Sequence, residues 1–264
     1  MEKKCNVFLH IGMQRTGSTF MQDEVFSKVS RENEEYNYIG REEKVVSVLR
    51  NLEDLNPEKI EDQVLSELED EKINIISGEN IYCHMWEKED ERYDKLEKIY
   101  HLFPDGKIIF GVREKEDLLV SWYKKYVVNG GTLKIEDFLE EIVNTDKLEY
   151  KPYLEELQCY FGKENVFVYR LRELKKDPEA LVEKVCSFIG SKPVSFKNVK
   201  HNVGYSLWQL KVSRVLNNLF KSSKNPDGLI PLHHRLHIHR MIFQNIPLPK
   251  PFRGKEVTLK DLKS

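Results

Sequence analysis

The sequence predicts an α/β fold in which helices cover a central parallel sheet. Short buried apolar runs alternate with segments of helical periodicity along most of the chain. Strands that alternate with helices favour parallel crossover connections. A length of 264 residues fits one such domain, and no internal repeat or low-complexity linker divides it, so we expect a single domain over residues 1–264.

The expected elements follow from these runs. Strands are predicted at residues 7–11, 36–39, 73–76, 107–112 and 166–169. Helices are predicted from residue 18 onward and at 43–51, 57–70, 90–103, 116–128, 135–143, 153–161, 178–190 and 206–220. Ligands of such sheets bind beyond the carboxyl ends of the strands, so the candidate site residues are sought there.

A glycine-bounded loop follows the first strand and leads directly into a helix. Gly12 and Gly17 have the spacing of the P-loop nucleotide motif, but Ser18 occupies the lysine position and Thr19 follows it. The cation lies inside the loop, at Arg15. Loop amides and a helix N-terminus bind phosphate well, although a plain glycine turn between a strand and a helix would have the same outline.

The loop resembles one particular family. Gln14-Arg15-Thr16-Gly17-Ser18-Thr19-Phe20 is similar to the 5′-phosphosulfate loop of sulfotransferases that use 3′-phosphoadenosine 5′-phosphosulfate (PAPS). The resemblance implies a three-layer P-loop-like α/β fold, PAPS as the donor, and 3′-phosphoadenosine 5′-phosphate (PAP) as a product. It also implies that residues 14–19 bind the donor and that Arg15 stabilises the leaving group, as a preorganised cation can.

A second motif follows the predicted strand 107–112. Arg113 and Ser121 have the Arg-x7-Ser spacing of the pair that grips the cofactor 3′-phosphate in this family, and Tyr123 is also kept. An arginine can bond a phosphate with two donors, and a hydroxyl adds a third. Glu114-Lys115 replaces the family's usual Asp-Pro. The alternative is a surface arginine beside Glu116 and a serine that faces solvent.

A third match is structural and lies further along the chain. Residues 174–190 resemble the family's Leu-x-x-Asp-Pro entry to a helix, with Asp177 as the expected N-cap and Pro178 in the first turn. Leu171 takes the place of the family's upstream tyrosine, which puts its adenine contact in doubt. The resemblance covers scattered motifs over residues 5–190, and the segment after Phe196 matches only loosely.

The expected general base is Glu79. Ser77-Gly78-Glu79-Asn80 resembles the turn that holds the catalytic glutamate of carbohydrate sulfotransferases, whereas phenol- and steroid-type members have a histidine in this region. The resemblance is therefore closer to the carbohydrate type, with His84 as the alternative base. A carboxylate at such a turn can also be merely solvated or cap a helix.

Charge is spread unevenly along the chain. Residues 196–264 hold 13 Lys and Arg against 3 Asp and Glu, within a chain of net charge −2. This basic segment suits an anionic acceptor or a solvated helical face. His233 and His237 would share a helix face, but no nearby carboxylate or cysteine completes a metal site, so we expect no metal.

Composition limits the other possibilities. No apolar run approaches the roughly 18 residues of a membrane span. The four cysteines lie far apart without a C-x-x-C pair, which suggests neither a zinc site nor a disulfide framework. The N-terminal residues pass directly into the first strand, so no signal peptide is expected and the cytoplasm is the predicted location.

Together these features predict a PAPS-dependent sulfotransferase. It would move a sulfuryl group to a hydroxyl or amine of a small-molecule or carbohydrate acceptor, with no nucleic-acid partner; its oligomeric state is left open. The alternatives are a P-loop nucleotide or small-molecule kinase, which would need Mg²⁺ and ATP, and a non-catalytic adenylate-binding relative, which would bind PAP without turnover.

Overall fold

The chain folds into two compact units. The computed structural model describes residues 6–52, 60, 63–83, 90–197, 204–231, 242–243 and 257–263. The first unit, here the sheet unit, comprises Met1–Met85, Glu89–Arg113 and Glu149–Lys200. The second, here the helical unit, comprises Trp86–Lys88, Glu114–Leu148 and His201–Ser264. That these units form a single domain stays a prediction.

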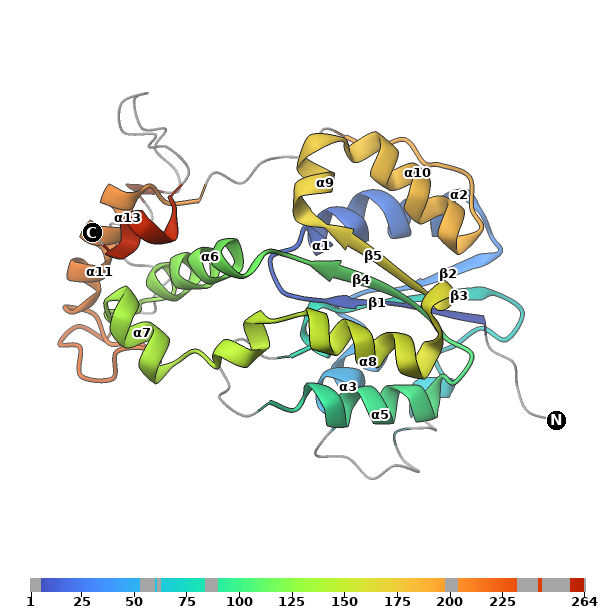
Figure 1. The fold of residues 1–264 in the computed structure, drawn as a ribbon, viewed down its shortest axis with the longest axis horizontal. Coiled ribbons are helices and arrows are strands. Elements are labelled where there is room, and N and C mark those ends of the chain that lie inside the picture. Colours follow the sequence, from blue (N-terminus) through green and yellow to red (C-terminus); the bar gives the residue numbers. More distant parts are fainter. Residues whose placement is uncertain are drawn as a thin grey trace. The chain divides into compact units, whose positions relative to one another are not determined.

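The sheet unit is built on five parallel strands in the order β2-β3-β1-β4-β5 (Figure 1). The strands are β1 (Asn6–Gly12), β2 (Tyr36–Ile39), β3 (Ile73–Ser77), β4 (Lys107–Val112) and β5 (Val166–Arg170). All five were predicted, and the expected parallel α/β fold is confirmed. The central strand β1 pairs with β3 on one side and with β4 on the other, so the residues at its carboxyl end have neighbours on both sides.

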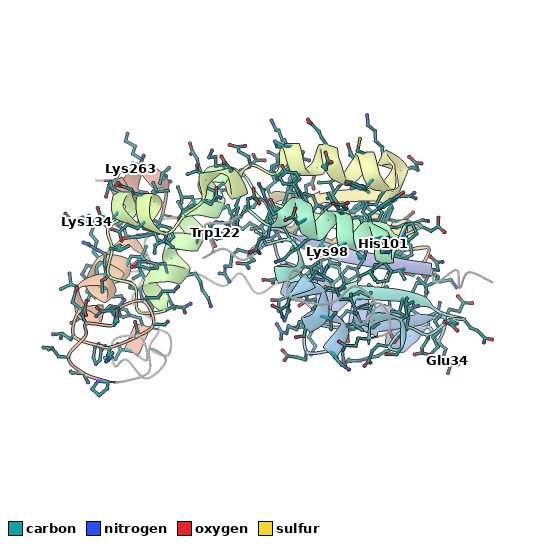
Figure 2. All side chains as sticks on the ribbon, turned by 90° about the horizontal axis from the view of Figure 1, so that it is seen from below. Glu34, Lys98, His101, Trp122, Lys134 and Lys263 are labelled. Atoms are coloured by element: carbon teal, nitrogen blue, oxygen red, sulfur yellow. The ribbon has the colours of Figure 1, made fainter. Side chains whose placement is uncertain are left out.

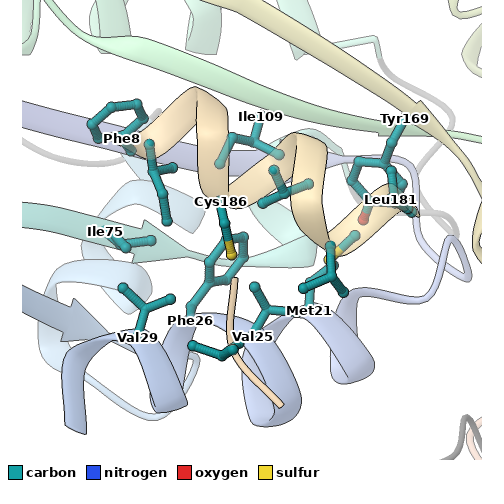
Figure 3. Close-up of a cluster of buried hydrophobic side chains, with 14 of the residues drawn as sticks. Phe8, Met21, Val25, Phe26, Val29, Ile75, Ile109, Tyr169, Leu181 and Cys186 are labelled. Atoms are coloured by element: carbon teal, nitrogen blue, oxygen red, sulfur yellow. The ribbon is translucent and has the colours of Figure 1, made fainter. Parts of the chain in front are cut away.

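One face of the sheet packs on two helical segments (Figure 3). The first runs from residue 18 to 32 as α1 (Ser18–Phe20), a π-helical stretch η1 (Met21–Phe26) and α2 (Ser27–Glu32). The second is α10 (Pro178–Ile189), which follows the short helix α9 (Leu171–Lys176). Phe8, Ile75 and Ile109 of the sheet meet Phe26 and Cys186 of the helices in one apolar cluster.

The opposite face is covered by α3 (Lys44–Arg50), α5 (Arg92–Leu102) and α8 (Lys151–Phe161) (Figure 1). Phe110 of β4 contacts Tyr153 of α8, with 5.7 Å between ring centroids. Leu96 and Ile99 are the buried apolar residues of α5. These two helical layers and the sheet form the three-layer arrangement that the sequence predicted.

A buried arginine fastens the start of α5. The Arg92 side chain is 2% exposed, and its guanidinium donates from Nε and Nη2 to the two carboxylate oxygens of Asp90, each at 2.6 Å. Nη1 donates to the Tyr82 hydroxyl, also at 2.6 Å. A buried guanidinium needs such partners, so this bidentate pair fixes the chain before α5 against η3 (Glu79–Ile81) and the residues after it. Tyr82 is therefore a core residue.

The helical unit contains α6 (Lys115–Val128), α7 (Ile135–Glu141), η4 (Thr145–Leu148), α11 (Leu207–Asn217) and α13 (Leu259–Lys263). Trp122 on α6 is fully buried (Figure 2). Asn217 ties α11 to the end of α6, because its Nδ2 donates to the carbonyls of Val127 at 2.8 Å and Gly131 at 2.9 Å.

Most predicted helices are confirmed to within a few residues, and two features were missed. The π-helical stretch η1 interrupts the helix expected from residue 18, and α9 was not predicted. Within the predicted helix 57–70, residues 57–59 and 61–62 lie outside the described residues, as do 198–203, 232–241, 244–256 and 264 of the basic segment 196–264. Among the helices of the described ranges, none combines the length and apolar character needed to cross a membrane.

Candidate active site

The site is organised around the turn that leaves β1. Gly12, with φ of +141°, lies opposite Gly111 of β4, and the Met13 amide donates to the Gly111 carbonyl at 2.9 Å. A Cβ on Gly12 would lie 2.4 Å from that carbonyl oxygen. Only glycine permits both this left-handed conformation and this close approach of two backbones.

Polar contacts hold the loop after Gly12 in shape. The Thr16 hydroxyl donates to the Met13 carbonyl at 2.8 Å, across the loop. Gln14 Nε2 donates to the Cys83 carbonyl at 3.2 Å, which ties the loop to the chain beyond β3. Arg15 is exposed and has φ of +69°, a conformation that costs a non-glycine residue about 1 kcal/mol. Such strain is often found at ligand-binding loops.

Arg113 reaches the loop from β4. Its Nη1 donates to the Arg15 carbonyl at 3.1 Å, so the two arginines singled out in the sequence lie next to each other. This proximity follows from the pairing of β1 with β4, because the carboxyl ends of adjacent parallel strands lie at the same edge of the sheet. Two cations at one edge favour an anionic ligand with more than one charged group.

The helix that follows the loop begins with a left-handed Gly17, φ +93°. Among the described residues, no side chain caps this helix start. The first amide groups of a helix lack partners within it and can bind an anion. Ser18 is 4% exposed and Thr19 is exposed. Amides, a hydroxyl and the positive end of the helix dipole are the groups that bind a phosphate, so the residues present fit the 5′-phosphate of PAPS.

Two leucines lie beneath the loop. A Cβ on Gly17 would lie 2.5 Å from Leu174 and 3.4 Å from Leu171, both on α9. Leu171 therefore packs close to the loop backbone, at the position where the family pattern has a tyrosine.

Glu79 follows β3, which pairs with β1 on the side opposite β4. The Gly78 amide donates to the His10 carbonyl at 3.1 Å, which places the turn before Glu79 beside the end of β1. The Glu79 carboxylate affects the pKa values of two groups in the sheet unit. Burial lowers the pKa of Arg50, and the carboxylates of Glu42 and Glu79 oppose that shift. Glu79 also raises the pKa of Tyr169, although burial of the phenol is the larger cause.

The roles of two further predicted site residues stay predictions. Ser121 lies on α6 in the helical unit, where it is 7% exposed, and its role stays a prediction. His84, the alternative base, lies outside the described residues, as do His233 and His237. Among the residues that the structure describes, no group of three or more histidine, cysteine, aspartate or glutamate side chains could hold a metal ion.

The sequence reasoning missed a group of buried polar side chains directly behind the loop. His10 of β1 bonds Ser77 of β3 through Nδ1 at 2.6 Å and the Tyr169 hydroxyl of β5 through Nε2 at 2.9 Å. Burial raises the pKa of Tyr169, and the Thr16 and Ser18 hydroxyls of the loop oppose that shift. The signal in the sequence is a histidine within an apolar strand, which needs buried partners.

Comparison with known proteins identifies the class. Residues 6–225 match the family model described as "Sulfotransferase domain". The chain therefore belongs to the sulfotransferase domain family, the class of enzymes that transfer a sulfuryl group from PAPS. A comparison with curated protein sequences found no significant match.

One of three similar solved structures supports the fold. The crystal structure of a sulfotransferase from Alicyclobacillus acidocaldarius is similar with a TM-score of 0.52 and 16% identity, over 81% of this chain and 93% of that chain. Mouse sulfotransferase SULT7A1 complexed with PAP has a TM-score of 0.44 and 19% identity, over 71% of this chain and 58% of that one. The sulfotransferase domain from the curacin biosynthetic pathway has a TM-score of 0.41 and 14% identity, over 94% and 93%. The fold likeness rests on the first of these.

Proposed function

We propose that this enzyme sulfates a hydroxyl group of a small-molecule or carbohydrate acceptor, with Glu79 as general base and Arg15 as the cation that stabilises the leaving group. The observation that carries the proposal is the juxtaposition at the end of β1. The Arg15 loop continues β1, and the turn before Glu79 is hydrogen bonded to the same strand at His10. A base and a leaving-group cation on opposite sides of the sulfuryl group suit an in-line transfer.

The donor is PAPS, which supplies an activated sulfuryl group when bound. Gln14, Thr16, Gly17, Ser18 and Thr19 of the loop would hold its 5′-phosphate through backbone amides and hydroxyls. Since Arg113 already bonds the loop carbonyl of Arg15, it lies at the edge of that site and suits the 3′-phosphate. Ser121 would add a hydroxyl to the same phosphate.

The chemistry requires a proton acceptor and a stabilised leaving group. The acceptor oxygen forms a bond to sulfur while the bond from sulfur to the bridging oxygen of the donor breaks. Glu79 takes the proton from the acceptor hydroxyl, because an alcohol is a weak nucleophile until that proton leaves. Arg15 interacts with the negative charge that grows on the departing PAP. The described loop residues 12–19 contain no carboxylate whose negative charge would repel the departing PAP.

A carbohydrate-like acceptor is supported by two features of the chain. The Ser77-Gly78-Glu79 turn resembles that of carbohydrate sulfotransferases, and residues 196–264 carry an excess of Lys and Arg. Acceptors with several hydroxyls and an anionic group suit a chain that has both a carboxylate base and an excess of basic side chains. The kinase alternative is set aside, because the sulfotransferase family model spans residues 6–225 and the Walker lysine position holds Ser18.

The test separates donor binding from turnover. We expect Glu79→Gln to bind PAP as tightly as the wild type in isothermal titration calorimetry, while its kcat with radiolabelled PAPS and a screened carbohydrate acceptor falls by about 10²- to 10⁴-fold. Glu97→Gln, at an exposed position on α5, is the matched control and should retain full activity. A Glu79→Gln enzyme with wild-type kcat would rule out Glu79 as the base.

A further inference from the structure

Exposed apolar side chains gather in one stretch of the helical unit. Among the described residues, seven large hydrophobic side chains are exposed, and six of the seven lie between residues 204 and 243. These six are Trp208, Val215, Leu219, Leu229, Ile230 and Ile242. Single exposed apolar residues are ordinary, but such a concentration is typical of an interaction surface.

Three of these side chains share one face of α11 and of the turn that continues it. With 3.6 residues per turn, Trp208, Val215 and Leu219 lie within about 40° of one another around the helix axis. Leu219 follows the last residue of α11, and its amide donates to the Leu216 carbonyl at 3.1 Å, so it stays in the turn. The three residues therefore form one apolar stripe.

The face of α11 that is buried is polar instead. Gln209, Ser213 and Asn217 are 7%, 0% and 1% exposed. The hydrogen bonds from Asn217 to the carbonyls of Val127 and Gly131 fix this face inward. An ordinary surface helix buries its apolar face and exposes its polar one, so α11 has the reverse arrangement. This reversal favours a further surface that covers the apolar stripe.

A turn extends the stripe beyond the end of α11. The Ile230 amide donates to the Leu219 carbonyl at 2.9 Å, and the Lys221 amide donates to the Ile230 carbonyl at 2.8 Å. These two backbone bonds hold Ile230 beside the end of the stripe. Leu229, the residue before it, is 83% exposed and so projects from the turn. Together, Trp208, Val215, Leu219, Leu229 and Ile230 are here called the apolar surface.

The charged groups around the apolar surface are mostly basic. Lys211 is exposed and lies about 60° from Trp208 around α11, and the exposed Lys221 follows the stripe. Residues 204–243 contain six Lys and Arg, four His and one carboxylate, Asp227. Apolar side chains bordered by lysines, with a tryptophan among them, are typical of helices that lie in the headgroup region of a membrane.

We infer that the apolar surface docks on an anionic lipid membrane. Leu229 and the stripe on α11 would lie among the headgroups and upper acyl chains, with Lys211 and Lys221 at the level of the lipid phosphates. A second copy of the chain is disfavoured, because it would bring like charges together. A bilayer adapts to a projecting Leu229, whereas a folded partner needs a pocket shaped to receive it. The inference does not depend on the acceptor class proposed above.

The first experiment measures binding of the full chain to vesicles. Sucrose-loaded vesicles of phosphatidylcholine with about 30% phosphatidylglycerol should sediment the protein at physiological salt at least about tenfold more tightly than vesicles of phosphatidylcholine alone. Binding should shift the tryptophan emission to the blue, and this shift should be lost in Trp208→Phe. Absence of binding to the anionic vesicles overturns the inference, as does an equal blue shift in Trp208→Phe.

Variants then separate docking from general attraction between charges. Leu229→Asp should weaken vesicle binding by at least about tenfold, whereas Leu229→Trp should bind at least as tightly as the wild type. The double variant Lys211→Ala/Lys221→Ala should weaken binding by about tenfold. Lys163→Ala/Lys192→Ala removes the same charge from exposed positions of the sheet unit and should change the affinity by less than about twofold. Wild-type binding by Leu229→Asp, or equal losses in the two lysine pairs, overturns the inference.

Sedimentation velocity without lipid tests the protein alternatives. A chain that is monomeric alone and binds the anionic vesicles supports the inference. A dimer that Leu229→Asp dissociates would identify a second copy as the occupant of the apolar surface and overturn it. A monomer that fails to bind the vesicles would also overturn it and would leave an acidic protein as the partner that the lysines favour.

Discussion

Burial of His10 predicts a specific loss of stability between neutral and mildly acidic pH. Its pKa is about 6.5 in the unfolded chain and about 3 in the folded protein. Between these values the unfolded chain binds a proton that the folded protein does not, so the free energy of unfolding falls as the pH falls through this window. From about pH 7.5 to about pH 5.5 the loss from this one group is about 1.4 kcal/mol, and above about pH 7 it contributes almost nothing.

Urea unfolding at a series of pH values tests this prediction. Lowering the pH from about 7.5 to about 5.5 should shift the wild-type midpoint down by about 0.5 M, and His10→Gln should lack this contribution because glutamine does not titrate. This pH window lies above the pKa values of ordinary carboxylates, so their titration contributes little to the change in stability. His101→Gln, at an exposed position on α5, is the matched control for loss of an imidazole (Figure 2). If wild type and His10→Gln lose the same stability over this window, the assignment of a buried neutral His10 is refuted.

Three further predictions concern the loop, its neighbouring arginine and one helix cap. Arg113→Ala should raise the Kd for PAP by at least about tenfold in calorimetry, with partial recovery in Arg113→Lys; an unchanged Kd would remove Arg113 from the site. Gly12→Ala should lower the melting temperature by about 6–12 °C, a loss of about 3 kcal/mol, since its Cβ would lie 2.4 Å from the Gly111 carbonyl; a wild-type melting curve would contradict the close approach. Asp177→Ala should cost about 1 kcal/mol in urea unfolding, because the Asp177 carboxylate accepts from the Ala180 amide at 2.9 Å, whereas Asp177→Asn should cost less; equal losses would argue against capping.

Local sequence patterns were enough for the features that depend on neighbours in the chain. The strand before Gly12, the helix start at Ser18 and the N-cap at Asp177 each depend on residues within one or two turns. Arg113 could be placed near the loop because it follows a strand of the same parallel sheet. These features carried the prediction of the fold and the family.

The features that were missed depend on register between distant strands. Nothing near His10 in the sequence indicates that Tyr169, 159 residues later, would supply its partner. Gly111 of β4 lies between β1 and β5 and leaves room for the Tyr169 side chain. The role of this glycine becomes visible only when the pairing of β4 with β5 is known. The π-helical stretch η1 is likewise not a property of the local apolar pattern, which fits an ordinary helix.

The order of the strands also bears on how quickly the loop can form. His10 lies 67 residues from Ser77 and 159 residues from Tyr169, so the chain must close long loops before these contacts stabilise anything. Sheets with such distant pairings belong to the slowly folding class. The donor-binding loop is complete only when β1, β3, β4 and β5 have all paired, and we expect this to occur on the native side of the folding barrier. A ligand that recognises the finished loop therefore prolongs the life of the folded enzyme by slowing its unfolding, while the rate at which new chains fold stays the same.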